Sequence, residues 1–458
     1  MDAPATRAST DTSLRLPFCI SRNCPSATPT APTAAVAAAA VLAVPAPASA
    51  QGYGLYEQGA CMMGRAGAGV AAPCADASAI YFNPAALAEL DTTVVSGGVV
   101  GVGPRGQFTN DRTGTVSKLN DRTFPVPSAY YAQRLGRLHV GLGLNAPYGL
   151  ASDWPTTSEG RFLGYYSSVQ GIYIQPTVAA RVGSRVDIGG GIDITHLSVE
   201  LKRRVDLATQ LIPGGGGATF AALGVPAGTD FADVRLTGSA VHVGAHVGVQ
   251  VKANDRVSFG ARYLVGQRVP VNNGSLAPTQ IMTGRLLPIP LPGVPAGTPL
   301  DTLLAPQFAS GRALGPQSAK TEIPLPAQFV VGTAMQLVGG ERPWTLFADY
   351  QMTQWSLFDT ITITNAVAPA SALIGDYRDT HGLRLGLEHK LRDGVTIRGG
   401  VDAHNAAAPD QSVTPILPEA SRTEYAVGAT VPLTQKLYVD FAYMYIDQAN
   451  RRGRTIPI

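Results

Sequence analysis

GRAGAGVAAPCADASAIYFNPAALAEL, residues 64–90, is the stretch that decides how the rest of the chain is interpreted. Thirteen of its 27 residues are glycine or alanine, so its backbone can approach other backbone closely. It follows a hydrophobic N-terminal segment and precedes a long series of segments in which apolar and polar residues alternate. A compact segment of small residues in this position is what a plug inside a β-barrel needs.

The segment before this stretch has the features of a secretory signal. Residues 33–50 read TAAVAAAAVLAVPAPASA and end in an A-x-A cleavage pattern. We therefore expect residues 1–50 to be a leader and signal peptide, with Gln51 as the first mature residue. A retained helical anchor is disfavoured because the run is short and interrupted by proline. Residues 1–32 exceed an ordinary n-region, which a start codon assigned too far upstream would explain.

Cys61 and Cys74 flank the glycine-rich part of this stretch. An oxidising periplasm permits a disulfide between them, which would stabilise the fold by roughly 3 kcal/mol in the chain-entropy model. Two free, buried thiols are the alternative, and the sequence leaves both open. No histidine or third cysteine lies nearby, so we expect no metal site here, and no cofactor is expected.

The composition excludes several classes of protein. The 458 residues are 45% hydrophobic and 15% charged, with 51 glycines and a net charge of +3. The chain is too polar for a bundle of membrane helices and poor in charge for a soluble enzyme of this size. No basic run indicates nucleic acid as a partner. We find no G-x-S-x-G motif and no paired acid and histidine cluster, so we expect no enzymatic activity.

Behind residue 91, segments of about ten residues alternate, which is the length that a tilted strand needs to cross a bilayer. In residues 240–251, Val241, Val243 and Val247 face one side. His242, His246 and Gln250 face the other side, where the two histidines indicate packing rather than metal binding, since no carboxylate accompanies them in the local spacing. Thirteen candidate strands lie near residues 93–103, 126–135, 137–146, 170–182, 186–204, 231–251, 256–269, 321–338, 343–363, 379–391, 394–402, 421–432 and 436–447.

A soluble β-sandwich can alternate too, but long uniform strands joined by short turns, with no amphipathic helices between them, favour a membrane barrel. We therefore predict an all-β fold, a transmembrane antiparallel β-barrel. Residues 51–91 form an N-terminal hatch inside the lumen. Residues 92–458 form the barrel, with long loops at residues 206–229 and 270–319.

The C-terminus departs from this pattern. An odd number of strands makes the first and last strands parallel, which prevents ordinary antiparallel closure. The tail after Asp447 shows no alternation and ends without an aromatic residue. We interpret this as a missing C-terminal strand, caused by truncation or a frame shift.

The order of Gly64, Arg65, Asp76, Asn83, Pro84 and Ala85 resembles the hatch of the FadL/TodX family. These proteins are outer-membrane channels for long-chain fatty acids and other hydrophobic molecules, and their barrels close with fourteen strands. Weaker matches follow in the same order along the chain, at residues 145–150, 154, 160–161, 349–351, 355, 358 and 415–422.

The resemblance implies passive uptake across the outer membrane of a Gram-negative bacterium. A ligand is captured in extracellular loops, passes to a pocket beside the hatch, and leaves sideways at a kink in the third strand. Pro147, Tyr148 and Gly149 fall on that kink and end the predicted strand, since proline lacks a backbone donor. An ordinary transition from strand to loop is the alternative.

The same resemblance places a head-group-binding arginine at Arg203, with a solvated rim charge as the alternative. A register slip of one residue would turn Lys202 or Arg204 inward instead. Composition alone makes four residues of the apolar second loop candidates for a ligand groove, and a disordered loop is the alternative. These candidates are Leu287, Ile289, Leu291 and Val294.

The expected partners are a hydrophobic small-molecule substrate, outer-membrane lipid and lipopolysaccharide, and the barrel-assembly machinery. We expect a monomer. Competing interpretations are an aromatic or alkane hydrocarbon channel of the same family, a general porin, a structural barrel and, least favoured, an outer-membrane enzyme.

Overall fold

The computed structural model describes residues 6–9, 52–212, 216–338, 340 and 342–455. Apart from Thr6–Ser9, the predicted leader, signal peptide and mature start lie outside the described residues. None of the described helices is long and apolar enough to span a bilayer.

Alternation of apolar and polar residues produces most of the strands. Along β9 (Asp230–Asn254), Val241 and Val243 lie on the outer face and are 66% and 61% exposed. His246 and Gln250 point the other way and are buried. A protein whose apolar face is exposed and whose polar face is buried has the pattern of a barrel surrounded by lipid. The predicted two faces of this strand are confirmed.

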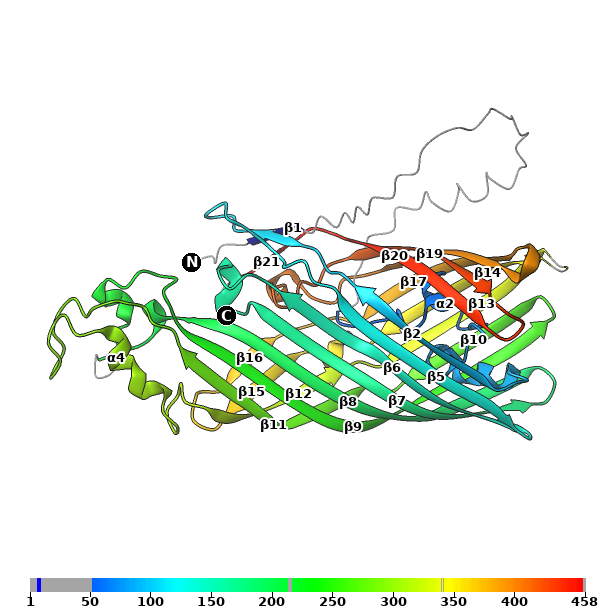
Figure 1. The fold of residues 1–458 in the computed structure, drawn as a ribbon, viewed down its shortest axis with the longest axis horizontal. Coiled ribbons are helices and arrows are strands. Elements are labelled where there is room, and N and C mark those ends of the chain that lie inside the picture. The colour runs from blue at the N-terminus through cyan, green and yellow to red at the C-terminus, as the bar shows by residue number, and fades with distance from the viewer. Residues whose placement is uncertain (1–5, 10–51, 213–215, 339, 341, 456–458) are drawn as a thin grey trace, which may run out of the picture.

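The strands curl into a closed antiparallel barrel (Figure 1), which confirms the predicted fold class. In chain order the barrel strands are β2 (Val94–Val102), β5 (Phe124–Leu135), β6 (Leu138–Asp153), β7 (Tyr166–Val182), β8 (Val186–Asp206), β9, β10 (Val257–Leu264), β11 (Gln267–Gln280), β12 (Gln317–Leu325), β13 (Gln328–Val338), β14 (Trp344–Thr353), β15 (Thr360–Asn365), β16 (Ser371–Ile374), β17 (Thr380–Lys390), β18 (Thr396–His404), β19 (Arg422–Pro432) and β20 (Tyr438–Gln448).

A second, smaller sheet lies at one end of the barrel. Its strands are β1 (Thr6–Ser9), β3 (Gln107–Thr109), β4 (Val116–Lys118) and β21 (Arg451–Gly453), in the order β21-β1-β3-β4. The short α-helices are α2 (Ala60–Met63), α3 (Ala79–Phe82) and α4 (Leu300–Leu304). A short 3₁₀ helix, η1 (Pro84–Glu89), follows α3.

Three of the predicted long strands are each broken in two, which corrects their predicted extent. Residues 256–269 divide between β10 and β11, residues 321–338 between β12 and β13, and residues 343–363 between β14 and β15. The first two breaks lie side by side, because a Cβ atom on Gly266 would be 2.8 Å from the Ala327 nitrogen. Pro326 adds to the second break, since it has no backbone N–H for the ladder.

The predicted loop at residues 270–319 is also corrected. β11 runs to Gln280 and β12 begins at Gln317, so the connection is residues 281–316. The loop predicted at residues 206–229 lies between β8, which ends at Asp206, and β9, which begins at Asp230. In Figure 1 both connections, with α4, lie at the same end of the barrel.

The barrel meets itself where β20 returns beside β2. Every successive pairing from β2 to β20 is antiparallel, and among the described strands no register-matched ladder joins β2 to β20. A cavity of about 580 Å³ lies at this seam, lined from both strands by residues that include Val102 and Tyr445. The sequence did not predict this cavity.

Candidate functional site

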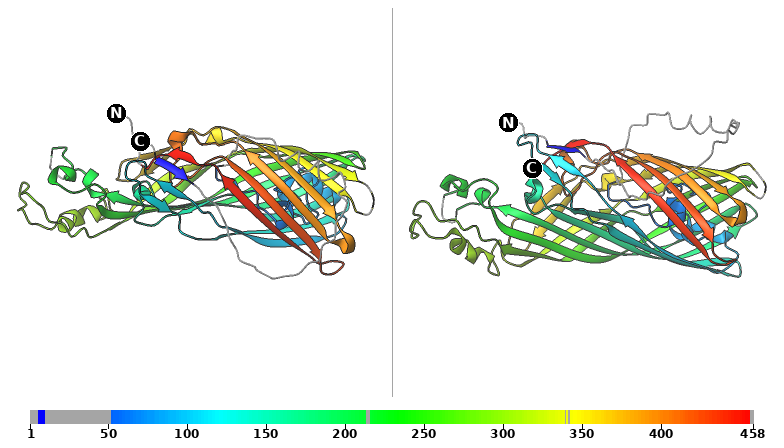
Figure 2. Two further views of the ribbon diagram at one scale, coloured as in Figure 1. Left: turned by 90° about the horizontal axis from the view of Figure 1, so that it is seen from above. Right: turned by 45° about the horizontal axis from the view of Figure 1, so that its top comes forward.

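Residues 52–91, called the N-terminal segment below, pack inside the barrel. Met62, Ile80 and Leu87 are fully buried. Helix α2 contacts β19 and β20, whereas η1 contacts β7, β8 and β9 on another part of the wall. Figure 2 shows this blue segment among the strands in two further views. A disulfide joins Cys61 to Cys74 within it.

Small residues on both sides allow this packing. A Cβ atom on Gly64 would lie 2.9 Å from the Gly428 Cα atom of β19. A Cβ atom on Gly189 of β8 would lie 2.5 Å from the Pro84 backbone. Neither pair of backbones could approach so closely if either wall glycine carried a side chain. Ala85, beside Pro84, is fully buried.

Polar anchors fix the N-terminal segment to the wall. The Arg65 guanidinium lies 3.6 Å from the Glu388 carboxylate and 4.0 Å above the Phe347 ring. The Asn83 amide donates to the carbonyl oxygens of Val70 at 2.7 Å and Val249 at 3.0 Å.

Two further carboxylates accept hydrogen bonds from backbone N–H groups of the N-terminal segment. Asp349 of β14 accepts from the backbone N–H groups of Gly69 and Val70 at 2.7 and 2.9 Å. Asp76 accepts from the Ser78 N–H at 3.0 Å and so holds the turn before α3. Of the predicted hatch residues, Gly64, Arg65, Asn83, Pro84 and Ala85 therefore lie against or toward the barrel wall. The Asp76 side chain acts within the segment, while its backbone carbonyl accepts from the Ser96 hydroxyl of β2.

The kink in β6 lies where the barrel wall is incomplete. β5 pairs with β6 only as far as Ala129 and Leu144, and the register of β6 against β7 shifts between Asn145 and Tyr148. β6 then continues to Asp153, so the predicted end of the strand at Pro147 is wrong. Beyond Leu144, no ladder joins β5 to β6 in the described chain, although β5 stays paired with β2. We call this break the wall gap.

The N-terminal segment fills the hydrogen-bonding positions at the wall gap. The Leu55 N–H donates to the Pro147 carbonyl at 2.8 Å, and the Gly149 N–H donates to the Tyr53 carbonyl at 2.9 Å. Gln58 exchanges two hydrogen bonds with the backbone of Ala146, at 2.8 and 2.9 Å. The segment thus takes the place of β5 along this part of β6.

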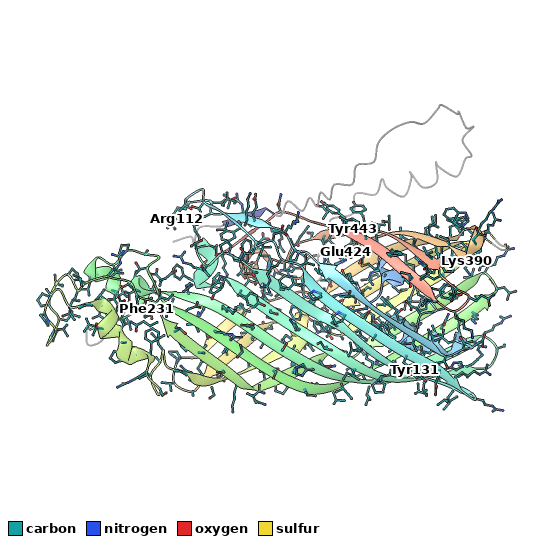
Figure 3. The ribbon with its side chains drawn as sticks, viewed as in Figure 1. Arg112, Tyr131, Phe231, Lys390, Glu424 and Tyr443 are labelled. Atoms are coloured by element: carbon teal, nitrogen blue, oxygen red, sulfur yellow. A yellow bond between two sulfur atoms is a disulfide. The ribbon has the colours of Figure 1, made fainter. Side chains whose placement is uncertain are left out.

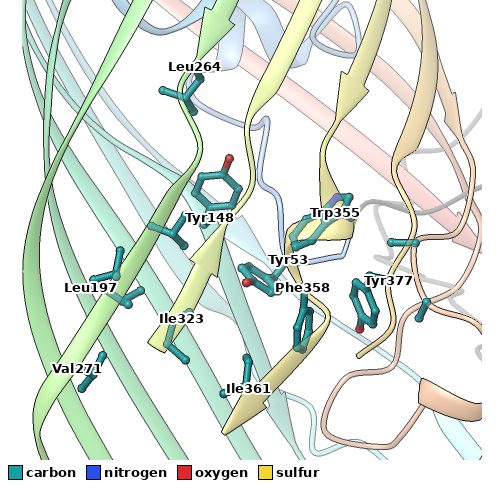
Figure 4. Close-up of a cluster of buried hydrophobic side chains, with 14 of the residues drawn as sticks. Tyr53, Tyr148, Leu197, Leu264, Val271, Ile323, Trp355, Phe358, Ile361 and Tyr377 are labelled. Carbon is teal, nitrogen blue, oxygen red and sulfur yellow. The ribbon is translucent and has the colours of Figure 1, made fainter. Parts of the chain in front are cut away.

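An aromatic cluster lines the barrel interior next to the wall gap (Figure 4). Tyr53 packs edge-on against Trp355, with ring centroids 4.7 Å apart, and lies beside Tyr148 and Phe358. The hydroxyls of Tyr53 and Tyr148 donate to the carbonyls of Pro324 and Pro326. Burial raises the pKa of Tyr53, so its hydroxyl stays protonated as a donor. The cluster is therefore mostly apolar, although Trp355 Nε1 has no hydrogen-bond partner within the described chain.

The structure separates the three neighbouring basic residues of β8. Lys202 lies 3.3 Å from Glu200, and Arg204 lies 3.4 Å from Asp233. Arg203 shares the opposite face of the strand with Leu197, which belongs to the buried cluster around Tyr148. Among the described residues, none forms an ion pair or hydrogen bond with Arg203.

The four predicted loop residues do not form one exposed groove. Leu287 is buried in a cluster that joins both long loops, and Leu291 and Val294 pack against that cluster. Ile289 is 53% exposed. Figure 3 labels Phe231, which belongs to the same cluster at the base of the loops. Apolar side chains that sequence reasoning did not single out are exposed nearby: Leu211, Met282 and Leu286.

Sequence reasoning also missed a buried polar network beside the kink. His246 Nδ1 lies 2.6 Å from the Asp193 carboxylate, and His246 Nε2 lies 3.0 Å from the Thr177 hydroxyl. Gln175 connects Asp193 to Asn145, the residue at the register shift. Nothing in the sequence indicates this network, because Asp193 and His246 are 53 residues apart. Only the pairing of β8 with β9 brings them together.

Comparison with known proteins identifies the family. Residues 40–453 match the family described as outer membrane protein transport protein (OMPP1/FadL/TodX). The chain belongs to this family. It is an outer-membrane protein of the kind found in Gram-negative bacteria, and members of the family transport fatty acids and hydrocarbons.

Relatives and solved structures agree with this placement. The 47 kDa outer membrane protein of Pasteurella multocida is 26% identical over 402 residues, which is 87% of this chain and 88% of that protein. The long-chain fatty acid transport protein of Escherichia coli K12 is 21% identical over 413 residues, which is 86% and 87% of the two chains. The fold is shared with a Pseudomonas aeruginosa FadL homologue, at a TM-score of 0.68 and 20% identity. That match covers 88% of this chain and 96% of the homologue. It is also shared with the Pseudomonas putida toluene transporter TodX, at a TM-score of 0.57 and 16% identity. That match covers 88% of this chain and 96% of the TodX chain.

Proposed function

We propose that this protein is a passive uptake channel for hydrophobic molecules such as long-chain fatty acids, with lateral exit through the wall gap. The observation that carries the proposal is the pairing of Tyr53–Gln58 with the kinked part of β6, where β5 is no longer paired. This arrangement is a closed gate whose moving part is the N-terminal segment. Transport is downhill, because moving apolar surface out of water provides the driving force.

Capture begins at the long loops. Met282, Leu286 and Ile289 expose apolar side chains around residues 281–289. Exposed apolar patches of this kind mark binding sites for hydrophobic ligands. Leu287, Leu291 and Val294 support the site from beneath by holding the two loops together.

Within the barrel, the ligand would pass from Arg203 to the aromatic cluster. Arg203 has no protein partner among the described residues, and a guanidinium binds a carboxylate through paired, charge-assisted hydrogen bonds. The acyl chain would lie along the face that Arg203 shares with Leu197, toward Tyr148 and Tyr53. Movement of Tyr53–Gln58 away from β6 then connects this path to the wall gap.

A reversible cross-link tests the gate. Gly54 and Tyr148 are directly opposite each other in an antiparallel bridge, which is a geometry that a disulfide can span. In cells that express Gly54→Cys/Tyr148→Cys, oxidation should reduce uptake of labelled oleate to the level of an empty vector, and reductant should restore it. The two single variants and the reduced wild-type chain are the controls. Unchanged uptake with complete cross-linking would exclude lateral exit at this gap.

A second experiment distinguishes the classes of ligand. Arg203→Ala should lower oleate uptake about tenfold, the effect of losing roughly 1.4 kcal/mol of binding, while Lys202→Ala should have little effect. Arg203→Lys should keep part of the uptake. If the wild-type chain instead takes up toluene or alkanes but no fatty acid, and Arg203→Ala changes neither, the protein is a hydrocarbon channel of the same family.

A further inference from the structure

A group of buried acidic and imidazole side chains lies on the inner face of β18 and β19, outside the path described above. Asp402 and Glu424 are directly opposite in the ladder between these strands, and His404 follows Asp402 on the same face. All three side chains are buried, at 1–2% exposure. Figure 3 labels Glu424 in this part of the barrel.

The distances between these side chains do not fit hydrogen bonds. His404 Nε2 lies 3.4 Å from Asp402 Oδ2 and 3.5 Å from Glu424 Oε1, beyond the usual 2.7–3.2 Å range. Within the described chain, neither ring nitrogen of His404 has a hydrogen-bond partner, and Asp402 Oδ1 has none either. Both contacts are within ion-pair range for a protonated imidazole, but buried polar atoms normally have hydrogen-bond partners, and these three atoms have none within the described chain.

The same distances fit ligands of one metal ion. Zinc binds histidine nitrogen and carboxylate oxygen at about 2.0–2.2 Å in a tetrahedral arrangement, which separates neighbouring ligand atoms by roughly 3.3–3.6 Å. We propose that Asp402, His404 and Glu424 bind a divalent transition-metal ion such as Zn²⁺. One imidazole and two carboxylates would leave a fourth position for water. The proposal does not depend on the proposed transport function.

Two arginines lie beside the carboxylates, and Arg384 also stacks on the Tyr56 ring of the N-terminal segment. Arg384 Nε lies 2.9 Å from Asp402 Oδ2, and Arg422 Nε lies 3.1 Å from Glu424 Oε1. Such outer contacts orient carboxylate ligands. Their positive charge also opposes the ion, so we expect weaker binding than at a structural zinc site. The group of Cys61, Cys74 and Asp76 is not an alternative, because its two sulfur atoms are joined to each other.

Cobalt binding tests the proposal. The full chain, purified in detergent without a histidine tag and treated with a chelator, is titrated with Co²⁺ and followed by visible absorption. We expect one ion per chain, intense d–d bands of low coordination number, and displacement by Zn²⁺. His404→Ala should weaken Co²⁺ binding at least tenfold, whereas His242→Ala on β9 should bind as the wild-type chain does.

A second variant keeps the proposal testable if the first one misfolds. If His404→Ala does not form a barrel, Glu424→Gln keeps the shape of the side chain but removes its charge, and should also weaken binding at least tenfold. Absence of stoichiometric cobalt in the wild-type chain, or equal affinity in a folded variant at either position, would overturn the proposal.

Discussion

Asn83 shows how one side chain can join the N-terminal segment to the barrel. Its amide donates to carbonyls of both Val70 and Val249, and its oxygen accepts from the Ala85 N–H at 3.2 Å. Asn83→Ala leaves two buried carbonyls without this donor. Since an unsatisfied buried group costs roughly 1–3 kcal/mol, we expect a loss of that size in urea unfolding in detergent.

The matched control for this prediction is Asn120→Ala. Asn120 also uses its amide, donating to Asp153 at 2.9 Å, but on the surface. Its loss should change the free energy of unfolding by less than about 0.5 kcal/mol. Equal effects of the two variants would contradict an anchoring role for Asn83.

Individual residues of the site were predictable where the motif itself contained them. Asn83-Pro84-Ala85 and Arg65 stand out in the sequence as part of a small-residue stretch. Their partners Glu388 and Val249 were not predictable, because strand register far along the chain brings them into contact. The approach of Glu424 to His404 was hidden for the same reason, since Glu424 lies on the next strand, whereas Asp402 stands only two residues before His404.

At the scale of elements, the disulfide holds the turn that contains Gly64 and Arg65. Cys61 and Cys74 are 13 residues apart, and their Cα atoms are separated by 6.3 Å. Closing a loop of this length stabilises a folded chain by about 3 kcal/mol in the chain-entropy model. We expect Cys61→Ser/Cys74→Ser to lose stability of that order in urea. The wild-type chain under reductant should show the same loss, and an unchanged midpoint in both would contradict it.

The long loop at residues 281–316 depends on one carboxylate. Burial of Asp301 opposes ionisation, but the N–H groups of Thr283 and Gly284 donate to it at 2.8 and 2.9 Å and hold its pKa below the ordinary value. A lowered folded pKa stabilises the loop above the ordinary carboxyl pKa of about 3.9, and this contribution is lost as the pH falls through the lowered value.

Hydrogen exchange measures this dependence. Corrected for intrinsic rates, protection of the Thr283 and Gly284 amides should fall below about pH 4. Asp301→Asn should show low protection without that step, whereas Asp111→Asn, on an exposed turn, should behave as the wild-type chain. A step that persists in Asp301→Asn would assign it to another group.

The elements themselves were largely predictable, because alternation in a strand depends only on which side faces lipid. The strand breaks were not, since two of them occur where Gly266 and Ala327 approach each other closely. The continuation of β6 past Pro147 was missed because the N-terminal segment supplies the hydrogen bonds that Leu144 and the residues before it receive from β5. The local sequence does not indicate which distant residues supply these hydrogen bonds.

At the scale of the whole molecule, the barrel needs lipid or detergent around an apolar outer face. Val243 lies on this face between Val241 and Ala245, and its side chain is 61% exposed. An arginine near the bilayer midplane on such a face costs about 2–4 kcal/mol. We therefore expect Val243→Arg to lower the free energy of unfolding in lipid vesicles by up to that amount.

Val116→Arg is the matched control, because Val116 is also well exposed, at 48%, but lies on β4 of the small sheet outside the barrel. It should change stability by no more than about 0.5 kcal/mol. In aqueous solution an arginine would be tolerated equally at both positions, so only a surrounding bilayer separates the two variants. Equal stability of the two variants would show that the valine face of β9 is not in contact with lipid.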